Sequence, residues 1–135
     1  MNHLLSLNSF SFRYKVINNK SIYDIQTSLT WQRSGSTLAM TYEDAEVYVA
    51  CLNDSHFGGW CDWRLPTLEE AESLMTIRKH NDVYICPFFS PTQHLIWTSD
   101  KEKSDTVWVV LYSLGFCKHM NEHTLSYTRA VRKGE

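Results

Sequence analysis

The chain has 135 residues, a formal net charge of −2 and 43% hydrophobic residues. This length fits one domain, which we place over residues 1–135 with an N-terminal arm or edge strand at 1–20, and the hydrophobic content excludes a mostly disordered chain. The small net charge argues against direct nucleic-acid binding, because such surfaces carry an excess of Lys and Arg. Aromatic side chains are frequent, with 5 Trp, 7 Tyr and 6 Phe.

Short β-prone runs make up most of the first third of the chain. Residues 14–17 and 21–25 flank the turn-forming run Asn18-Asn19-Lys20, and residues 29–32 form a third predicted strand. A polar loop at 33–37 separates these strands from the first predicted helix.

The first predicted helix begins after Thr41, which is the expected N-cap with Asp44 three residues later. Apolar residues then recur at spacings of three and four and predict one buried face. They are Tyr42, Ala45, Val49 and Leu52. The polar run 53–55 ends the helix.

The second predicted helix has the stronger start signal. Thr67 is the expected N-cap, Glu70 completes a capping box, and Pro66 blocks extension toward the N-terminus. We expect this helix to end near residues 78–81, followed by an irregular segment at 82–95.

The last third again predicts strands. They cover residues 96–99, 106–112, 116–120 and 127–131, with a charged turn at 100–105. The 106–112 run is apolar on both faces, which is typical of a central strand covered on both sides. Strands, two helices and further strands in that order indicate an α+β fold.

Several segments occur in the order found in a known family. They are Leu29-Thr30-Trp31-Gln32, the 42–52 helix, Gly58-Gly59-Trp60-Cys61-Asp62-Trp63-Arg64-Leu65-Pro66-Thr67, Trp97-Thr98-Ser99, Trp108-Val109-Val110 and Arg129-Ala130-Val131-Arg132. This pattern resembles the Lcl C-terminal domain family over roughly residues 22–132. The resemblance implies a C-type-lectin-like fold, with two helices packed on twisted antiparallel strands. It also implies a binding module: some members are adhesin tips that bind sulfated glycans, and others resemble the variable proteins of diversity-generating retroelements.

Within the shared pattern we expect a set of framework residues. They are Trp31, Asp62, Trp63, Arg64, Thr67, Trp108 and Arg132. Large aromatic side chains usually fill the cores of small domains, so the tryptophans are expected to be mostly buried. Arg64 is expected to pair with Asp62 or a nearby carbonyl, because a buried arginine needs a partner.

The polar, histidine-rich segment 113–126 is the expected binding surface. Its candidate contact residues are Ser113, Phe116, His119, Asn121, His123 and Thr124, with Trp97 and Tyr112 as aromatic anchors. Such side chains suit adaptable recognition. An ordinary polar hairpin is the alternative interpretation.

The resemblance to variable proteins adds a pattern to this segment. Their diversification targets adenines in codons such as AAC, which makes Phe116, Cys117, His119, Asn121, His123 and Thr124 reachable, whereas Lys118, Met120 and Glu122 are not. From Cys117 to His123 the two sets alternate, as the two faces of a strand would.

Metal and catalytic motifs are weak. Cys117, His119 and His123 have ligand chemistry, and an i, i+4 pair of histidines lies on one face of a helix, but we expect a strand and turn there, where that spacing means less. The acidic turn at 100–105 contains interleaved lysines and is expected to be a solvated turn rather than a calcium site. No nucleophile-elbow, phosphate-loop or zinc-protease motif occurs, so we expect no catalytic residue and no cofactor.

Four cysteines, Cys51, Cys61, Cys86 and Cys117, lack a C-x-x-C pair and are expected to be free and mostly buried. The sequence shows no secretory leader and no long apolar run, which favours a cytoplasmic location without a membrane span.

Three functions remain open at this point. The first is a non-enzymatic variable protein that binds a protein or glycan ligand, with a reverse-transcriptase-associated protein as a candidate partner. The second is a calcium-independent, glycan-binding adhesin-type domain. The third is a regulatory or assembly domain that docks a protein partner.

Overall fold

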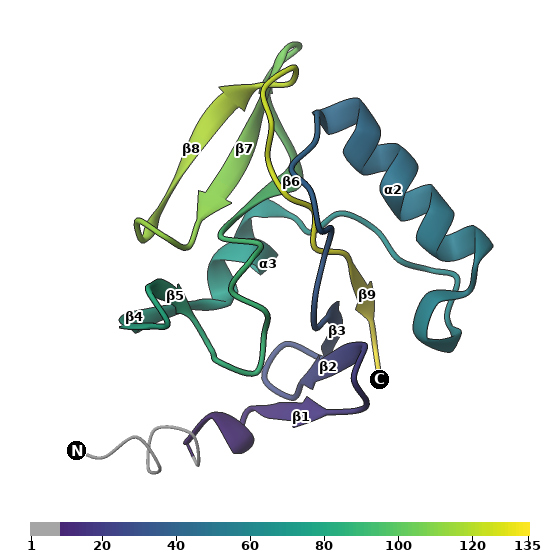
Figure 1. The fold of residues 1–135 in the computed structure, drawn as a ribbon, viewed down its shortest axis with the longest axis vertical. Coiled ribbons are helices and arrows are strands. Elements are labelled where there is room, and N and C mark those ends of the chain that lie inside the picture. The colour runs from purple at the N-terminus through teal and green to yellow at the C-terminus, as the bar shows by residue number, and fades with distance from the viewer. Residues whose placement is uncertain (1–8) are drawn as a thin grey trace.

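A computed structural model describes residues 9–135 and confirms the α+β class (Figure 1). The two longer helices, at 42–54 and 68–73, and three antiparallel sheets surround the last segment of the chain, which runs through the middle of the molecule. Of the expected arm at 1–20, residues 1–8 lie outside the described residues, and residues 14–16 form an edge strand.

The first sheet has the order β1-β2-β3-β9. Its strands are β1 (Tyr14–Val16), β2 (Ser21–Asp24), β3 (Leu29–Gln32) and β9 (Val131–Lys133). Strands β1 to β3 confirm the predicted strands to within one residue at each end. Trp31 of β3 pairs with Val131 of β9, so the sheet joins two distant parts of the sequence.

The predicted strand at 127–131 is displaced toward the C-terminus. Residues 128–130 are not part of a β-strand, because Thr128 forms two hydrogen bonds with Ser36 instead of pairing with a strand. The Ser36 amide donates to the Thr128 carbonyl at 2.8 Å, and the Thr128 amide donates to Ser36 Oγ at 3.0 Å.

Helix α2 (Tyr42–Asp54) confirms the predicted start, face and end. Thr41 Oγ1 accepts a hydrogen bond from the Asp44 amide at 3.3 Å, which satisfies one of the free amides of the first turn. The four predicted apolar residues are all buried. The short 3-10 turn η1 (Phe57–Gly59) follows.

Helix α3 (Leu68–Ser73) has the predicted capping box at Thr67 and Glu70 but is much shorter than expected. The prediction that it reaches residues 78–81 is wrong, since β4 (Met75–His80) and β5 (Val83–Ile85) form a hairpin there. Asn81 and Asp82 connect the two strands with φ of 55° and 65°. Two consecutive positive φ values are what a two-residue hairpin turn requires, and Asn and Asp tolerate them better than most residues.

The third sheet contains β6 (Leu95–Lys103), β7 (Thr106–Leu111) and β8 (Phe116–Asn121) in that order. Strand β6 extends through the segment predicted as a charged turn, which shrinks to the hairpin tip. The prediction of a central, doubly covered β7 is confirmed: Val109 joins the apolar cluster beside α2, and Val110 joins the cluster on the other face.

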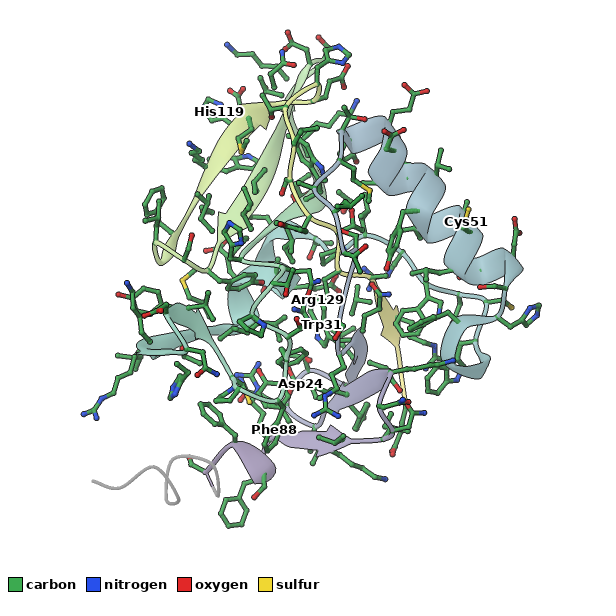
Figure 2. All side chains as sticks on the ribbon, viewed as in Figure 1. Asp24, Trp31, Cys51, Phe88, His119 and Arg129 are labelled. Carbon is green, nitrogen blue, oxygen red and sulfur yellow. The ribbon has the colours of Figure 1, made fainter. Side chains whose placement is uncertain are left out.

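The C-terminal segment 126–133 connects the first sheet, the third sheet and the loop that contains Arg64. Tyr127 bridges Ile96, and Val131 exchanges two backbone hydrogen bonds of 2.9 Å with Arg64. Arg129 lies fully buried at the centre near Trp31 (Figure 2). Its guanidinium donates to the carbonyl oxygens of Gln32, Arg33 and Ser90 and to Gln93 Oε1 at 2.6–3.0 Å.

Within the described residues Arg129 has carbonyl and amide oxygen partners and the face of the Phe89 ring, 5.0 Å away, but no carboxylate partner. Burial lowers its pKa to about 10. Four convergent acceptors fix the positions of loops at 32–33 and 90–93 around one side chain, which makes the interior a rigid framework.

Candidate functional site

Strand β8 is an edge strand, and its residues form much of the expected binding surface. His119 and Asn121 are exposed and Cys117 is half-buried, and all three share one face of the sheet. Lys118 and Met120 point to the opposite face. The predicted alternation of two side-chain sets along this segment therefore matches the two faces of an observed strand.

His119 lies on the outer surface of β8 (Figure 2) and packs against Trp108 of β7. Their ring centroids are 5.4 Å apart at an interplanar angle of 89°. Trp108 is only half-buried, so the expectation that it belongs to the core is wrong. Trp108 belongs to β7, next to the edge strand β8, which covers only part of the Trp108 ring. The ring therefore forms an aromatic contact at the surface rather than in the core.

The turn after β8 is built around Asn121. Its Oδ1 accepts from the His123 amide at 2.8 Å, and its carbonyl accepts from Thr124 Oγ1 at 2.6 Å. Asn121 is therefore held by its own turn. The His123 side chain is 81% exposed, and Thr124 is also exposed.

Phe116 and Ser113 lie at the other end of the same hairpin. Phe116 is 48% exposed and lies on the face opposite His119. Ser113 is half-buried, and its amide donates to the His94 carbonyl at 3.2 Å. The structure thus brings His119, His123 and Thr124 to one end of the sheet and leaves Phe116 and Ser113 apart from them.

The two expected aromatic anchors do not reach the surface. Trp97 and Tyr112 are fully buried. Trp97 Nε1 donates to the Met40 carbonyl at 2.9 Å, and the Tyr112 hydroxyl donates to the Ala71 carbonyl at 2.6 Å. The expectation that they contact a ligand is wrong, because each side chain faces inward and its polar atom already has a backbone partner.

The framework residues Trp31 and Trp63 are buried as expected. Of the two partners expected for Arg64, the nearby carbonyl is confirmed at Leu65 and the pairing with Asp62 is wrong. Arg64 pairs with Glu70 through two hydrogen bonds of 2.7 and 2.8 Å, and also donates to the Leu65 carbonyl. The Arg64 guanidinium lowers the pKa of the Glu70 carboxyl.

Asp62 pairs instead with Arg132, 70 residues away, at 2.6 and 3.2 Å. The Arg132 guanidinium lies 4.4 Å from the Trp60 ring centroid. These contacts fix the 60–64 loop to β9 and give Asp62, Trp60 and Arg132 structural partners.

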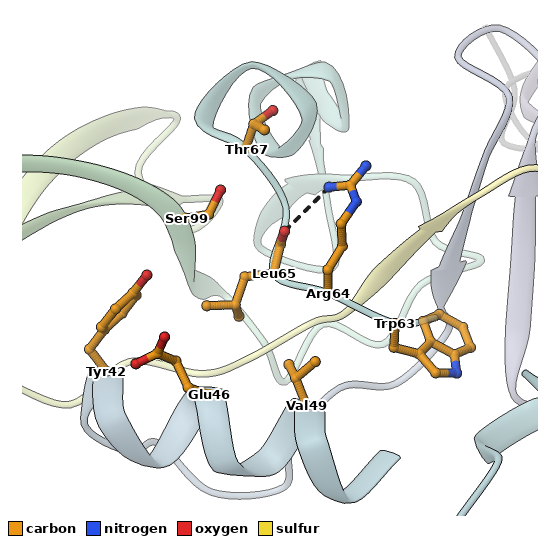
Figure 3. Close-up of a pocket in the computed structure, with 8 residues that line it drawn as sticks. All are labelled: Tyr42, Glu46, Val49, Trp63, Arg64, Leu65, Thr67 and Ser99. Atoms are coloured by element: carbon orange, nitrogen blue, oxygen red, sulfur yellow. Dashed lines mark hydrogen bonds between the residues drawn. The ribbon is translucent and has the colours of Figure 1, made fainter. Parts of the chain in front are cut away.

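An open cleft lies between α2 and the segment 63–67, with a cavity volume of about 550 Å³. Figure 3 shows Tyr42, Glu46 and Val49 projecting from α2 toward Leu65. Trp63, Arg64, Thr67 and Ser99 complete the lining. A cleft of this size can hold a small ligand or a long side chain.

A second cavity of about 320 Å³ adjoins the first. Tyr42 and Glu46 line both, and the second is completed by Glu43, Lys101, Glu122 and His123. The turn after β8 therefore forms one wall of this cleft system, and His123 is the predicted contact residue that belongs to it.

The cleft is electrostatically negative around Tyr42. Burial raises the pKa of the Tyr42 phenol, and the nearby carboxylates of Glu46, Asp100 and Glu122 raise it further. Lys101 is the basic group at this end of the cleft, and it lies 3.7 Å from Glu122.

Glu43, Glu46, Ser99 and Lys101 were not among the sequence-based candidates. Tyr42, Glu46 and Val49 are spaced by four and three, so the helix periodicity could have placed Glu46 beside the apolar face. Nothing local could have indicated Ser99 or Lys101, because only the packing of β6 against α2 brings them there.

Within residues 9–135 no three His, Cys, Asp or Glu side chains converge as metal ligands. In the same part of the chain, no helix has the length and apolar character needed to cross a membrane. The cytoplasmic location stays a prediction. Cys51 and Cys61 are exposed, Cys117 is half-buried and Cys86 is buried, so the expectation of mostly buried thiols is wrong.

A comparison with curated proteins finds no match to this chain. The model of one protein family, described as the Lcl C-terminal domain, matches residues 20–132. This range includes the 60–67 loop, both helices, the cleft and all of β8. The match covers most of the chain, and we conclude that this protein belongs to the Lcl C-terminal domain family.

Proposed function

We propose that this protein is a non-enzymatic ligand-binding domain, and that it is the variable protein of a diversity-generating retroelement. The binding surface consists of His119, His123 and Thr124, with Phe116 at the far end of β8. The observation that carries the proposal is that these side chains are exposed on an edge strand and its turn, over a buried framework.

The physical argument is that a display surface must change without unfolding the domain. Within residues 9–135 the His119 ring packs against the half-buried Trp108 ring, His123 lies 3.8 Å from Glu122, and Thr124 Oγ1 donates to the Asn121 carbonyl. Surface substitutions away from buried groups usually change stability by less than about 0.5 kcal/mol. The alternation along β8 supports the retroelement interpretation, because the adenine-reachable Cys117, His119 and Asn121 share one face.

A library of variants tests the tolerance of this surface. We expect most members randomised at Phe116, His119, His123 and Thr124 to keep the wild-type melting temperature within a few degrees. A control library at Trp97, Tyr112 and Val109 should consist mostly of unfolded proteins, since these residues are fully buried. Loss of folding throughout the first library would contradict a display role.

The gene neighbourhood tests the retroelement. A reverse-transcriptase gene and a near-copy of the DNA encoding residues 116–124 are expected beside this gene. Absence of both would overturn the retroelement assignment. Binding to a glycan array that persists in the presence of a chelator would then favour the adhesin-type alternative.

A further inference from the structure

We propose that the cleft beside α2 is a second binding site, and that it holds a lysine side chain from a basic segment of a partner protein. The site is lined by Tyr42, Glu46, Val49 and Leu65 and continues toward Glu43 and Glu122. It does not depend on the display role proposed for β8.

The walls of the cleft suit the aliphatic part of a lysine. Tyr42, Val49 and Leu65 supply an apolar surface between the helix and the 63–67 segment (Figure 3). The volume of about 550 Å³ exceeds what one aliphatic stem requires. Long cationic side chains commonly bury such stems while the charged end stays near water or an acceptor.

Glu46 supplies an available acceptor for the charged end. Its carboxylate forms no hydrogen bond or ion pair within residues 9–135 and projects from α2 into the cleft (Figure 3). Arg64, which lines the same cleft, is already neutralised by Glu70. An ammonium group would therefore meet an unpaired carboxylate beside the face of an aromatic ring.

Lys101 shows that this place accommodates a cation. Its Nζ lies 5.6 Å from the centroid of the Tyr42 ring, within the range of a cation–π contact. Its other contacts are loose, at 3.7 Å to Glu122 and 3.5 Å to the Ser104 carbonyl, and its side chain is 48% exposed. An incoming lysine can displace it at small cost, because exposed ion pairs of this length contribute little.

The extent of the acidic surface indicates a peptide rather than a single amine. The two cavities share Tyr42 and Glu46, and the second adds Glu43 and Glu122 beyond the first. One ammonium group needs one carboxylate, whereas basic residues spaced along an extended segment would meet these carboxylates in turn.

The test is a titration of the isotope-labelled full chain, followed by NMR, with the peptide acetyl-Gly-Lys-Gly-Lys-Gly-amide at low salt. We expect chemical-shift changes at Glu46, Val49 and Ser99 that weaken as the ionic strength rises. A matched peptide with norleucine in place of lysine should produce no saturable shifts in the cleft. Equal binding of the norleucine peptide would overturn the proposal, because the cleft would then select apolar groups.

Three variants make the assignment specific. Glu46→Gln should weaken binding of the lysine peptide about fivefold or more, the effect of losing roughly 1 kcal/mol of charge pairing. Glu72→Gln is the matched control on the exposed surface of α3, outside both cavities, and should leave binding unchanged. Lys101→Met should tighten binding, since it removes the competing cation.

Equal weakening by Glu46→Gln and Glu72→Gln would contradict a defined site and indicate nonspecific attraction. If N-acetyl-lysine amide binds as tightly as the peptide, a free amine rather than a protein segment is the ligand, and the proposed partner is wrong. Failure of any of these tests leaves the β8 libraries and the gene neighbourhood as independent tests of the display function.

Discussion

Gly35 shows how closely backbone segments approach each other in this small domain. The next residue, Ser36, holds Thr128 by two hydrogen bonds, which brings the 35–36 backbone directly against the C-terminal segment. A β-carbon at Gly35 would overlap the Thr128 carbonyl oxygen and lie 3.1 Å from Arg129 Cα. Glycine is required there for space, because both neighbours are backbone atoms that cannot turn away.

We therefore expect Gly35→Ala to lower the free energy of unfolding by about 2–3 kcal/mol, the usual cost of forcing extra atoms into a packed interior. Urea denaturation measures the change. Ser34→Ala is the control, since Ser34 is an exposed neighbour, and it should stay within about 0.5 kcal/mol of wild type. A wild-type midpoint for Gly35→Ala would contradict the close approach of residues 35 and 128.

At the scale of single elements, helix α3 depends on its caps. It has only six residues, and a helix this short is not stable alone in water. Glu70 accepts from the Thr67 amide at 2.9 Å and pairs with Arg64, while Asp100 of β6 accepts from the Leu68 amide. One carboxylate thus joins the helix start to the 60–67 loop that forms a wall of the cleft.

Glu70→Gln is expected to lower the free energy of unfolding by about 1–2 kcal/mol at pH 7, since it weakens a cap and a charged pair together. Because the folded state lowers the pKa of Glu70, the contribution of its charge is complete above the ordinary pKa of 4.5 and is lost as the pH falls through the lower folded value.

Denaturation of wild type and Glu70→Gln between pH 7 and pH 2.5 checks this pH dependence. The difference between the two proteins should shrink only in the acidic range, below pH 4.5. The exposed neighbour Glu69 takes no part in the cap within residues 9–135, so Glu69→Gln serves as the control and should show a small, pH-independent change. A Glu70→Gln difference that persists at pH 2.5 would contradict a role for the ionised carboxylate.

At the scale of the whole molecule, the four thiols report on the packing of different regions. Cys51 lies on the outer side of α2 (Figure 2) and Cys61 follows η1, and both are exposed. Cys86 is buried in the apolar cluster between the first sheet and α3, and burial raises its pKa to about 11. The thiolate is the reactive form, so both access and ionisation slow its reaction.

Alkylation by iodoacetamide at pH 7.5 should therefore modify Cys51 and Cys61 first. Cys86 should react on the order of a hundredfold more slowly, because a pKa raised to about 11 leaves little thiolate at this pH and burial limits access further. Mass spectrometry of digested samples follows each site, and all four thiols should react together in guanidinium chloride. Equal native rates at Cys51 and Cys86 would contradict the burial of the second.

Much of the fold could be predicted from local signals. The N-caps Thr41 and Thr67, the apolar face of α2 and the strands at 29–32 and 106–111 depend on residues a few positions apart, and each is confirmed. The alternation along β8 is local in the same sense. The 75–85 hairpin was missed because the strong cap at Thr67 favoured a longer helix, although Asn81-Asp82 between β-prone residues is a turn signal.

Partners and burial were decided by the tertiary structure. Asp62 pairs with Arg132 rather than Arg64, and the helix face with Glu46 meets the 63–67 segment and Ser99 to form a cleft. The sequence determined the α+β class, the helix starts and the polar edge strand, because these follow from neighbours along the chain. Only the tertiary structure decided that Trp97 and Tyr112 are buried and that Glu46 lines a cleft, because these properties depend on contacts between segments far apart in sequence.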